Sequence, residues 1–231
     1  MKLEATGISR IFFRNGRGTN YFHAVEPTDF ILQQGKLTEI IGRSGSGKST
    51  FSNMLAGLLT PSEGKVLIDG EDLYAMDDGA RSILRNRSIG MIPQGQTGLA
   101  SLTVLENVLA PAAMYGDPSR RRELASELLE LVGIPELENV YANELSGGEL
   151  RRMSIARALI NEPQIVIADE PTGDLDDETT ELVLKLLRDR ADRGSSVLMV
   201  THERSALSYA DFVFRMEKGV LRRWDRESGT E

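Results

Sequence analysis

Apolar residues in this chain recur in two patterns, short β-branched runs and longer stretches at helical spacing. Five runs predict strands, at residues 37–41, 65–70, 88–92, 164–170 and 196–201. Residues 51–59, which follow the first of these runs, have apolar side chains at helical spacing. Strands that alternate with helices indicate an α/β domain, and a chain of 231 residues with 40% hydrophobic residues is long enough to bury one full core.

The segment from residue 95 to 155 interrupts this alternation. Up to Gly116, its only charged residue is Glu106. Buried helix packing would explain that composition, and so would an apolar groove for a partner. Asp117 and Pro118 then have the residue types of a helix N-cap and a first helical position, and Gly133 has that of a helix stop. We therefore expect an inserted, largely helical segment at about 95–155.

Residues 1–13 predict an edge strand that carries two adjacent aromatic residues, Phe12 and Phe13, and residues 14–20 predict a turn-rich connection. Either aromatic ring would be able to pack on the core. In the alternative interpretation, one ring stacks on an adenine, an interaction worth about 1–3 kcal/mol per base that tolerates any base. We favour Phe12 for that role.

The stretch that says most about function matches the pattern G-x-x-x-x-G-K-[ST] and lies between a predicted strand and a predicted helix. Its glycines let consecutive backbone N–H groups surround an anion, and the positive end of the helix dipole adds to the attraction. Lys48 supplies a point charge to the β- and γ-phosphate oxygens, and the Ser49 hydroxyl is placed to ligate Mg²⁺. We predict a phosphate loop formed by Gly42, Arg43, Ser44, Gly45, Ser46, Gly47, Lys48, Ser49 and Thr50.

A second helix start has features of an anion site. Ser146 and Glu149 stand at the spacing of a capping box, which by itself explains why these two residue types are present. It does not explain Gly147 and Gly148, which leave the first N–H groups of a long helix uncovered. The chain therefore has two helix N-termini suited to phosphate but only one loop with a lysine.

Polar residues follow three of the predicted strands. Asp169 and Glu170 end one strand, and adjacent acids in such a place often cap the next helix. Beside a phosphate loop they have a second interpretation. Asp169 would hold Mg²⁺ through its water shell, and Glu170 would orient and deprotonate the attacking water. Gln94 follows another strand and is able to reach the same metal. His202 ends a third; it either caps a loop or contacts the γ-phosphate, because ligands bind at the carboxyl ends of strands in open α/β sheets.

Composition narrows the cellular setting. No run approaches the ~20 apolar residues that a membrane-spanning helix needs, and the first residues lack the features of a signal peptide, so we expect a soluble chain. The absence of cysteine suits a reducing compartment and excludes thiolate chemistry. A net charge of −8 argues against nucleic acid as a partner.

Taken together and in this order, the motifs resemble those of the ATP-binding subunits of ABC transporters. Phe12 matches the family's adenine-stacking aromatic residue, and Gln94 matches its Q-loop glutamine. His202 matches its switch histidine. Four longer stretches also match: Gly42–Thr50 the Walker A loop, Leu145–Glu149 the LSGGQ signature, Ile165–Glu170 the Walker B strand and Gly173–Asp176 the D-loop. The sequence around Gln94 is most similar to the lipoprotein-release and macrolide-export branch.

The resemblance implies a single ABC-type ATP-binding domain over residues 1–231. Its α/β fold would be a P-loop NTPase core of the RecA-like kind with a mostly parallel sheet, an N-terminal antiparallel β subdomain and an inserted α-helical subdomain. It also implies a split site, in which two copies pack head to tail around two Mg-ATP. Ser146, Gly147 and Gly148 would then act on the nucleotide of the partner copy.

The resemblance further implies that ATP hydrolysis moves an integral membrane permease subunit, which would place the chain in the cytoplasm on the inner face of the cell membrane. An alternative is a regulatory ATPase, similar to the cell-division branch, that gates a cell-wall hydrolase through a membrane partner. A DNA-acting ATPase is disfavoured because the chain has no room for a long coiled-coil insertion. The chain departs from the family pattern at Glu149, where glutamine is usual, and at Gly173, where serine or alanine is frequent.

Overall fold

The computed structural model describes residues 1–13, 21–95, 97–173, 175–202 and 205–224, so the predicted connection at 14–20 lies outside the described residues. Its larger sheet has six strands in the order β10-β9-β3-β8-β7-β6. Neighbouring strands are parallel except for the β9–β10 hairpin. The strands are β3 (Leu37–Ile41), β6 (Ile89–Ile92), β7 (Ile165–Asp169), β8 (Ser196–Thr201), β9 (Phe212–Glu217) and β10 (Val220–Arg223). Four of them confirm strands predicted from the sequence, whereas β9 and β10 were not predicted.

The second sheet is antiparallel, with the order β2-β1-β4-β5. Its strands are β1 (Leu3–Phe13), β2 (Tyr21–Leu32), β4 (Glu63–Ile68) and β5 (Glu71–Asp72). The expectation that residues 1–13 form an edge strand is wrong, because β1 pairs with β2 on one side and with β4 on the other. The pairing with β4 joins parts of the chain about sixty residues apart, which the strand's own sequence does not show. Asp69 and Gly70, which connect β4 to β5, both have a positive φ, as an Asp-Gly hairpin turn requires.

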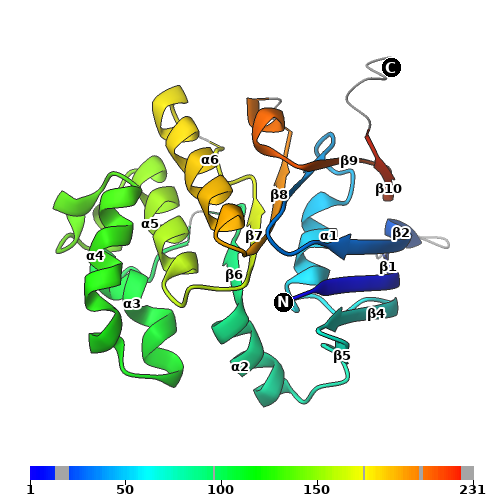
Figure 1. Ribbon diagram of the computed structural model, residues 1–231, viewed down its shortest axis with the longest axis horizontal. Helices are drawn as coiled ribbons and strands as arrows, with labels where there is room; N and C mark the ends of the chain where they lie inside the picture. Colours follow the sequence, from blue (N-terminus) through cyan, green and yellow to red (C-terminus); the bar gives the residue numbers. More distant parts are fainter. Residues whose placement is uncertain (14–20, 96, 174, 203–204, 225–231) are drawn as a thin grey trace.

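Helices cover both faces of the larger sheet (Figure 1). They are α1 (Lys48–Leu55), α2 (Asp78–Ser88), α3 (Val104–Tyr115), α4 (Arg122–Leu131), α5 (Gly147–Leu159) and α6 (Asp177–Asp192), with 3₁₀ turns η1 (Pro118–Arg121), η2 (Pro135–Leu137), η3 (Ala142–Glu144) and η4 (Ser205–Tyr209). Helix α1 lies between the two sheets and shares a core with both, while α5 and α6 pack on the opposite face. Among the described residues, no helix is long and apolar enough to cross a membrane.

The segment 95–155 is largely helical, as its sequence predicts, although α5 continues to Leu159. Asp117 caps the helical start at Pro118, whose first turn is 3₁₀, and Gly133 has a φ of 71° after α4 ends. Helices α3 and α4 gather at the end of the molecule opposite β10 (Figure 1). Burial of one face of α3 explains most of its uncharged composition, but Met114 near its end is 67% exposed.

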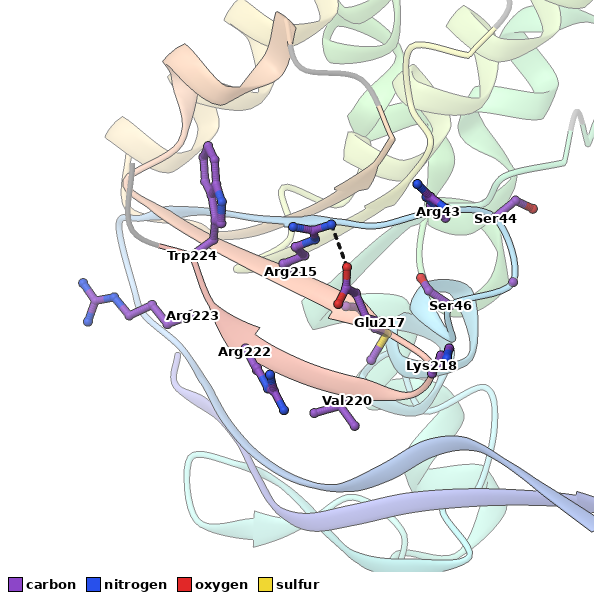
Figure 2. Close-up of a pocket in the computed structure, with 12 residues that line it drawn as sticks. Arg43, Ser44, Ser46, Arg215, Glu217, Lys218, Val220, Arg222, Arg223 and Trp224 are labelled. Carbon is purple, nitrogen blue, oxygen red and sulfur yellow. Dashed lines mark ion pairs between the residues drawn. The ribbon is translucent and has the colours of Figure 1, made fainter. Parts of the chain in front are cut away.

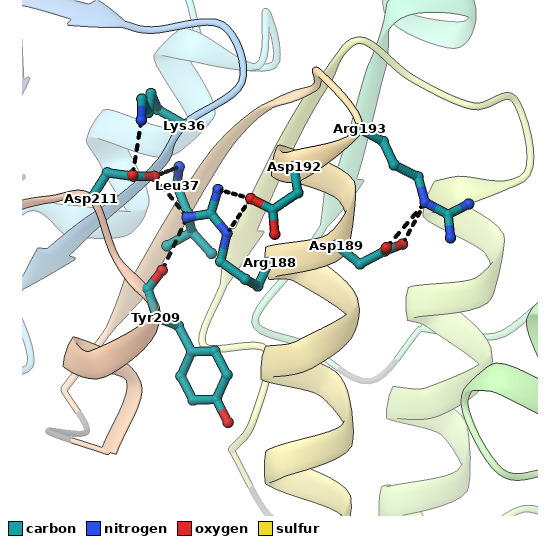
Figure 3. Close-up of polar contacts among 8 residues, drawn as sticks. All are labelled: Lys36, Leu37, Arg188, Asp189, Asp192, Arg193, Tyr209 and Asp211. Atoms are coloured by element: carbon teal, nitrogen blue, oxygen red, sulfur yellow. Dashed lines mark hydrogen bonds and ion pairs between the residues drawn. The ribbon is translucent and has the colours of Figure 1, made fainter.

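A polar network fixes the start of β3 against β9 and α6 (Figure 3). Asp211 accepts hydrogen bonds from the Leu37 N–H at 2.9 Å, from Arg188 Nη1 at 2.7 Å and from Lys36 Nζ at 3.1 Å. Arg188 also donates to the Tyr209 carbonyl at 3.1 Å. The strand that leads into the phosphate loop is therefore held at its amino end by a shared carboxylate.

Candidate active site

The phosphate loop joins the end of β3 to the start of α1. Gly47, the last residue before the helix, has a φ of 109°, and no side chain caps the helix start, so its first N–H groups face outward. A Cβ atom at Gly47 would lie 2.1 Å from the Ala24 carbonyl oxygen, and one at Gly42 would lie 2.4 Å from that of Met216. Because β2 and β9 approach the loop so closely, these two positions require glycine.

Lys48 extends from the first turn of α1 back over the loop. Its ammonium donates hydrogen bonds to the carbonyl oxygens of Gly42 at 2.7 Å and Arg43 at 3.2 Å. It also lies 3.9 Å from Glu170 Oε1, and the residue is only 6% exposed. The ammonium therefore lies against the backbone of the same loop whose N–H groups suit a phosphate.

Glu170 directly follows β7 and has the left-handed φ of 51°, which is rare for a residue other than glycine. Its N–H donates to the Val200 carbonyl at 2.7 Å, which fixes the backbone against β8. Its Oε2 lies 2.9 Å from His202 Nδ1. In a neutral imidazole Nδ1 would then be the donor, leaving Nε2 as an acceptor on a side chain that is 66% exposed. The carboxylate thus lies between a cation and a histidine, an arrangement suited to a general base.

Asp169 ends β7 below the loop and is 2% exposed. Burial raises the pKa of its carboxyl group above the ordinary value, although a hydrogen bond from Ser49 acts in the opposite direction. Its Oδ1 has no hydrogen-bond partner among the described residues. A buried carboxylate oxygen without a partner beside a hydroxyl is a donor set of the kind that Mg²⁺ prefers. Ser49 and Asp169 therefore fit the metal that the sequence predicts.

One cavity of about 690 Å³ collects most of the predicted residues. Those that line it are Phe12, Arg43, Ser44, Gly45, Gly47, Lys48, Ser49, Thr50, Gln94, Glu170 and His202. Gly42 and Ser46 belong to the same loop but do not line this cavity. Five lining residues were missed in the sequence, namely Phe22, His23, Ala24, Lys218 and Gly219. They come from β2 and from the β9–β10 turn, and no local motif marks them.

The two adjacent aromatic residues of β1 have different surroundings. Phe13 is 82% exposed and does not line the cavity, whereas Phe12 does. The Phe12 ring stacks on Phe22 with a centroid distance of 5.8 Å, and the Arg10 guanidinium lies 4.8 Å from its centroid. The aromatic surface at this end of the cavity therefore consists of a pair of rings.

The start of α5 carries the predicted capping box. The Ser146 hydroxyl accepts a hydrogen bond from the Glu149 N–H at 3.4 Å, and Glu149 Oε2 lies 2.7 Å from both the N–H and the hydroxyl of Ser146. These hydrogen bonds from Ser146 lower the pKa of the Glu149 carboxyl group. Ser146, Gly147 and Gly148 do not line the cavity of Lys48. The predicted D-loop includes Asp174, which lies outside the described part of the chain.

This geometry places a phosphate loop, the buried Glu170 carboxylate and His202 on one cavity. Residues 25–173 match the family model described as "ABC transporter". The chain belongs to the ABC transporter family. By its family and by the residues around its cavity, it is an ATP-binding cassette and an ATP hydrolase, as the sequence predicts.

The chain is similar to two curated relatives of the predicted branch. It is 44% identical over 197 residues to the lipoprotein-releasing system ATP-binding protein LolD of Xanthomonas campestris pv. campestris (strain 8004), which covers 84% of this chain and 82% of LolD. It is 38% identical over 220 residues to the macrolide export ATP-binding/permease protein MacB of Aggregatibacter actinomycetemcomitans, covering 95% of this chain and 34% of MacB.

The fold resembles that of a solved cassette. The dimeric structure of the bacterial ABC transporter cassette MJ0796 superposes with a TM-score of 0.88 and 30% identity, covering 96% of this chain and 98% of that chain. This likeness confirms the predicted fold class, a mostly parallel α/β core with an antiparallel sheet and a group of helices.

Proposed function

We propose that two copies of this chain pack head to tail around two Mg-ATP and drive conformational change in membrane-spanning partner subunits for solute transport. The observation that carries the proposal is that one chain has two helix N-termini suited to bind phosphate, and that only one of them lies at the nucleotide cavity. The start of α1 has Lys48, Glu170 and His202 around it, whereas the start of α5 has bare glycine N–H groups and lies outside that cavity. A second copy that brings its α5 to this cavity completes the site.

Each residue then has a part in ATP hydrolysis. The loop N–H groups and Lys48 bind the β- and γ-phosphates, and the α5 start of the partner copy binds the γ-phosphate from the other side. Glu170 takes a proton from the attacking water, and His202, 2.9 Å away, orients that carboxylate. Mg²⁺, held by Ser49, Gln94 and Asp169, would neutralise charge on the β- and γ-phosphate oxygens. Phe12 and Phe22 offer an aromatic surface for adenine.

A groove on the side of the molecule suits the membrane partner. It encloses about 240 Å³ between the end of α1, helix α2 and the end of α3. Leu58, Met114 and Tyr115 contribute apolar surface there and are 40% or more exposed. We assign this groove to an apolar face of a cytoplasmic helix of the permease subunit, which would keep the chain on the inner face of the cell membrane.

Dimerisation tests the first part of the proposal. The Glu170→Gln protein saturated with Mg-ATP should sediment as a dimer, because nucleotide stays bound when hydrolysis is slow, and should be a monomer without nucleotide. The same protein carrying Lys48→Ala serves as the control and should remain monomeric. A Glu170→Gln protein that stays monomeric at high concentration with bound nucleotide would refute the shared site.

Membrane recovery tests the second part. Met114→Glu should reduce the fraction of the chain that co-purifies with membranes, because it places a charge in the groove. Leu131→Glu on α4 is the matched control, since Leu131 is also exposed but lies outside the groove. Equal recovery of both variants would contradict the assignment of the groove.

A further inference from the structure

A second cavity adjoins the nucleotide cavity, shares Arg43, Ser44, Gly45 and Lys218 with it and extends away along the β9–β10 hairpin; five of its twelve lining residues are cations. It encloses about 800 Å³ between residues 43–46 and the β9–β10 hairpin. We call it the basic hollow, defined by Arg43, Arg215, Lys218, Arg222 and Arg223. Figure 2 shows Arg43 on one side and the hairpin side chains with Trp224 on the other. One carboxylate is present, Glu217, and it pairs with Arg215 at 2.6 Å.

This concentration of positive charge is unusual in a chain whose net charge is −8. Arg43, Lys218 and Arg222 form no ion pair with any residue in the described part of the chain. Unpaired cations around a cavity create a field that attracts an anionic group. The proposed mechanism gives Arg222 and Arg223 no part in binding nucleotide.

A matching negative surface lies at the other end of the chain's longest axis. Every charged residue between Arg122 and Arg151 is a glutamate. We call residues 123–149 the acidic segment; it runs through α4, η2 and η3 into the start of α5. Glu136 and Glu144 are exposed, and within the described residues neither forms an ion pair. Glu144 stands two residues before Ser146, the first residue of the signature capping box.

The order of elements decides which surfaces meet in the proposed dimer. Along the molecule, α4 and α5 lie at one end, the phosphate loop lies further along, and β10 lies at the opposite end (Figure 1). If the α5 start of each copy faces the phosphate loop of the other, the two molecules run in opposite directions. The acidic segment of one copy then lies over the β9–β10 end of its partner, where the basic hollow opens.

We propose that the basic hollow of each copy receives the acidic segment of the other, so that two symmetric charge contacts set the register of the ATP-bound dimer. This inference rests on the proposed head-to-tail dimer. Surface charges act over about 8 Å at physiological ionic strength, so they steer encounter and fix orientation more than they add affinity. The dimer has two-fold symmetry, so each contact between the hollow of one copy and the acidic segment of the other occurs twice.

That symmetry allows a charge-swap experiment in a single chain. All variants carry Glu170→Gln, are saturated with Mg-ATP and are compared by sedimentation. Arg222→Glu and Glu144→Lys should each weaken dimerisation roughly tenfold, as expected for two repelling surface contacts. A chain carrying both changes should regain most of the loss, because each contact is restored with reversed polarity. Lys65→Glu, an exposed charge change on β4, is the control and should leave the dimer unchanged.

The chain's single tryptophan gives an independent signal. Trp224 lines the basic hollow and is partly exposed, so its fluorescence emission should move to shorter wavelength when the dimer forms. The shift should be smaller with Arg222→Glu at equal protein concentration and should return in the double variant. Melting temperature and Mg-ATP binding of each variant should match those of the parent.

The outcomes separate the two proposals. If no protein dimerises, the proposed function falls and this inference with it. If the parent dimerises and Arg222→Glu behaves like Lys65→Glu, the dimer stands and the charge contact is refuted. If Arg222→Glu leaves dimerisation intact but abolishes binding to vesicles of anionic lipid, the hollow faces a membrane surface and the inference is equally refuted.

Discussion

Arg151 on α5 donates a hydrogen bond from Nη2 to the Gln94 carbonyl at 2.5 Å, although 57 residues separate them. Its Nη1 donates to the Pro93 carbonyl at 2.6 Å, and the residue is 3% exposed. The helix that starts with the signature residues is therefore joined to the backbone that carries Gln94 to the nucleotide cavity.

Replacing Arg151 with Met should lower ATP turnover roughly ten- to a hundredfold, because the backbone at Gln94 loses its support and a small misplacement of a site residue slows a reaction by about that factor. The two buried carbonyls also lose their donors, so stability should fall by about 1–3 kcal/mol. Arg151→Lys, which keeps one donor, should recover part of the turnover. Turnover per folded molecule and thermal stabilisation by Mg-ATP separate the two effects. Unchanged turnover with reduced stability would give Arg151 a purely structural role.

Glu170→Gln should lower turnover by about 10²–10⁴, the usual contribution of a general base, and should leave nucleotide binding intact. Glutamine has nearly the same shape and is still able to accept a hydrogen bond from His202, so the site should not collapse. Phosphate release measures the rate, and Mg-ATP thermal shifts measure the binding. Glu63→Gln, on the exposed part of β4, is a control for the loss of one carboxylate. Near-normal turnover would mean that the base is a different residue.

Lys48→Ala should weaken ATP binding itself. The ammonium lies over the loop, and its removal takes away the positive point charge that faces the phosphates. Stabilisation by a ligand depends on its concentration relative to Kd, so Mg-ATP should raise the melting temperature much less than in the parent protein. Lys65→Ala should keep the full shift. An equal shift in both variants would contradict the role of Lys48.

Glu149→Gln should keep or strengthen ATP-driven dimerisation. The proposed dimer brings the start of α5 near a γ-phosphate, and the helix dipole offsets a negative charge there by only about 0.3–1 kcal/mol. Glutamine retains the acceptor that caps Ser146. Because hydrogen bonds from Ser146 lower the pKa of Glu149, the carboxylate is ionised at neutral pH and the effect should be the same at pH 6 and pH 8. A clear loss of dimer on ultracentrifugation would refute the expectation.

Asp211→Asn should reduce the free energy of unfolding by about 1–3 kcal/mol at pH 7, since one carboxylate receives hydrogen bonds from two cations and a backbone N–H. Burial alone would raise the pKa of Asp211, but its hydrogen bonds from Arg188, Leu37 and Lys36 lower it.

A carboxyl group with a lowered folded pKa stabilises the protein above its unfolded pKa of about 3.9, and that stabilisation is lost as the pH falls through the folded value. Urea titrations should therefore show a gap between wild type and Asp211→Asn at pH 7 that narrows towards pH 3. Asp189→Asn, which removes an exposed pair with Arg193, should show a much smaller gap. A gap that widens in acid would contradict this explanation.

The features that were predictable from the sequence are those with a local cause. The phosphate loop needs particular glycines within nine residues, the capping box at Ser146 needs a spacing of three, and the buried strands that lead to Asp169 and His202 are continuous apolar runs. These motifs gave the class of the fold and most of the residues around the nucleotide cavity.

The remaining features depend on contacts between distant residues. Strand β1 is an interior strand because it pairs with β4, which lies some sixty residues away in the chain. The alternation of apolar and polar residues within β1 suits either an edge or an interior position. Phe22 has no motif, and it reaches the cavity because β2 pairs with β1 at Phe12. Likewise Arg151 has no local signal for its contact with Gln94. Charges at residues 43 and 215–223 become one surface only when β3 and β9 lie side by side.

The backbone at Glu170 costs the folded protein free energy, because a left-handed φ of 51° is unfavourable by about 1–3 kcal/mol for a side chain of this kind. Folding offsets this free energy, because the turn is fixed when β7 and β8 pair and the Glu170 N–H donates to the Val200 carbonyl. The Glu170 carboxylate is thus already oriented when ATP binds, and it loses little orientational entropy on reaching the transition state. Loosening this turn would make the resting protein more stable and the enzyme slower.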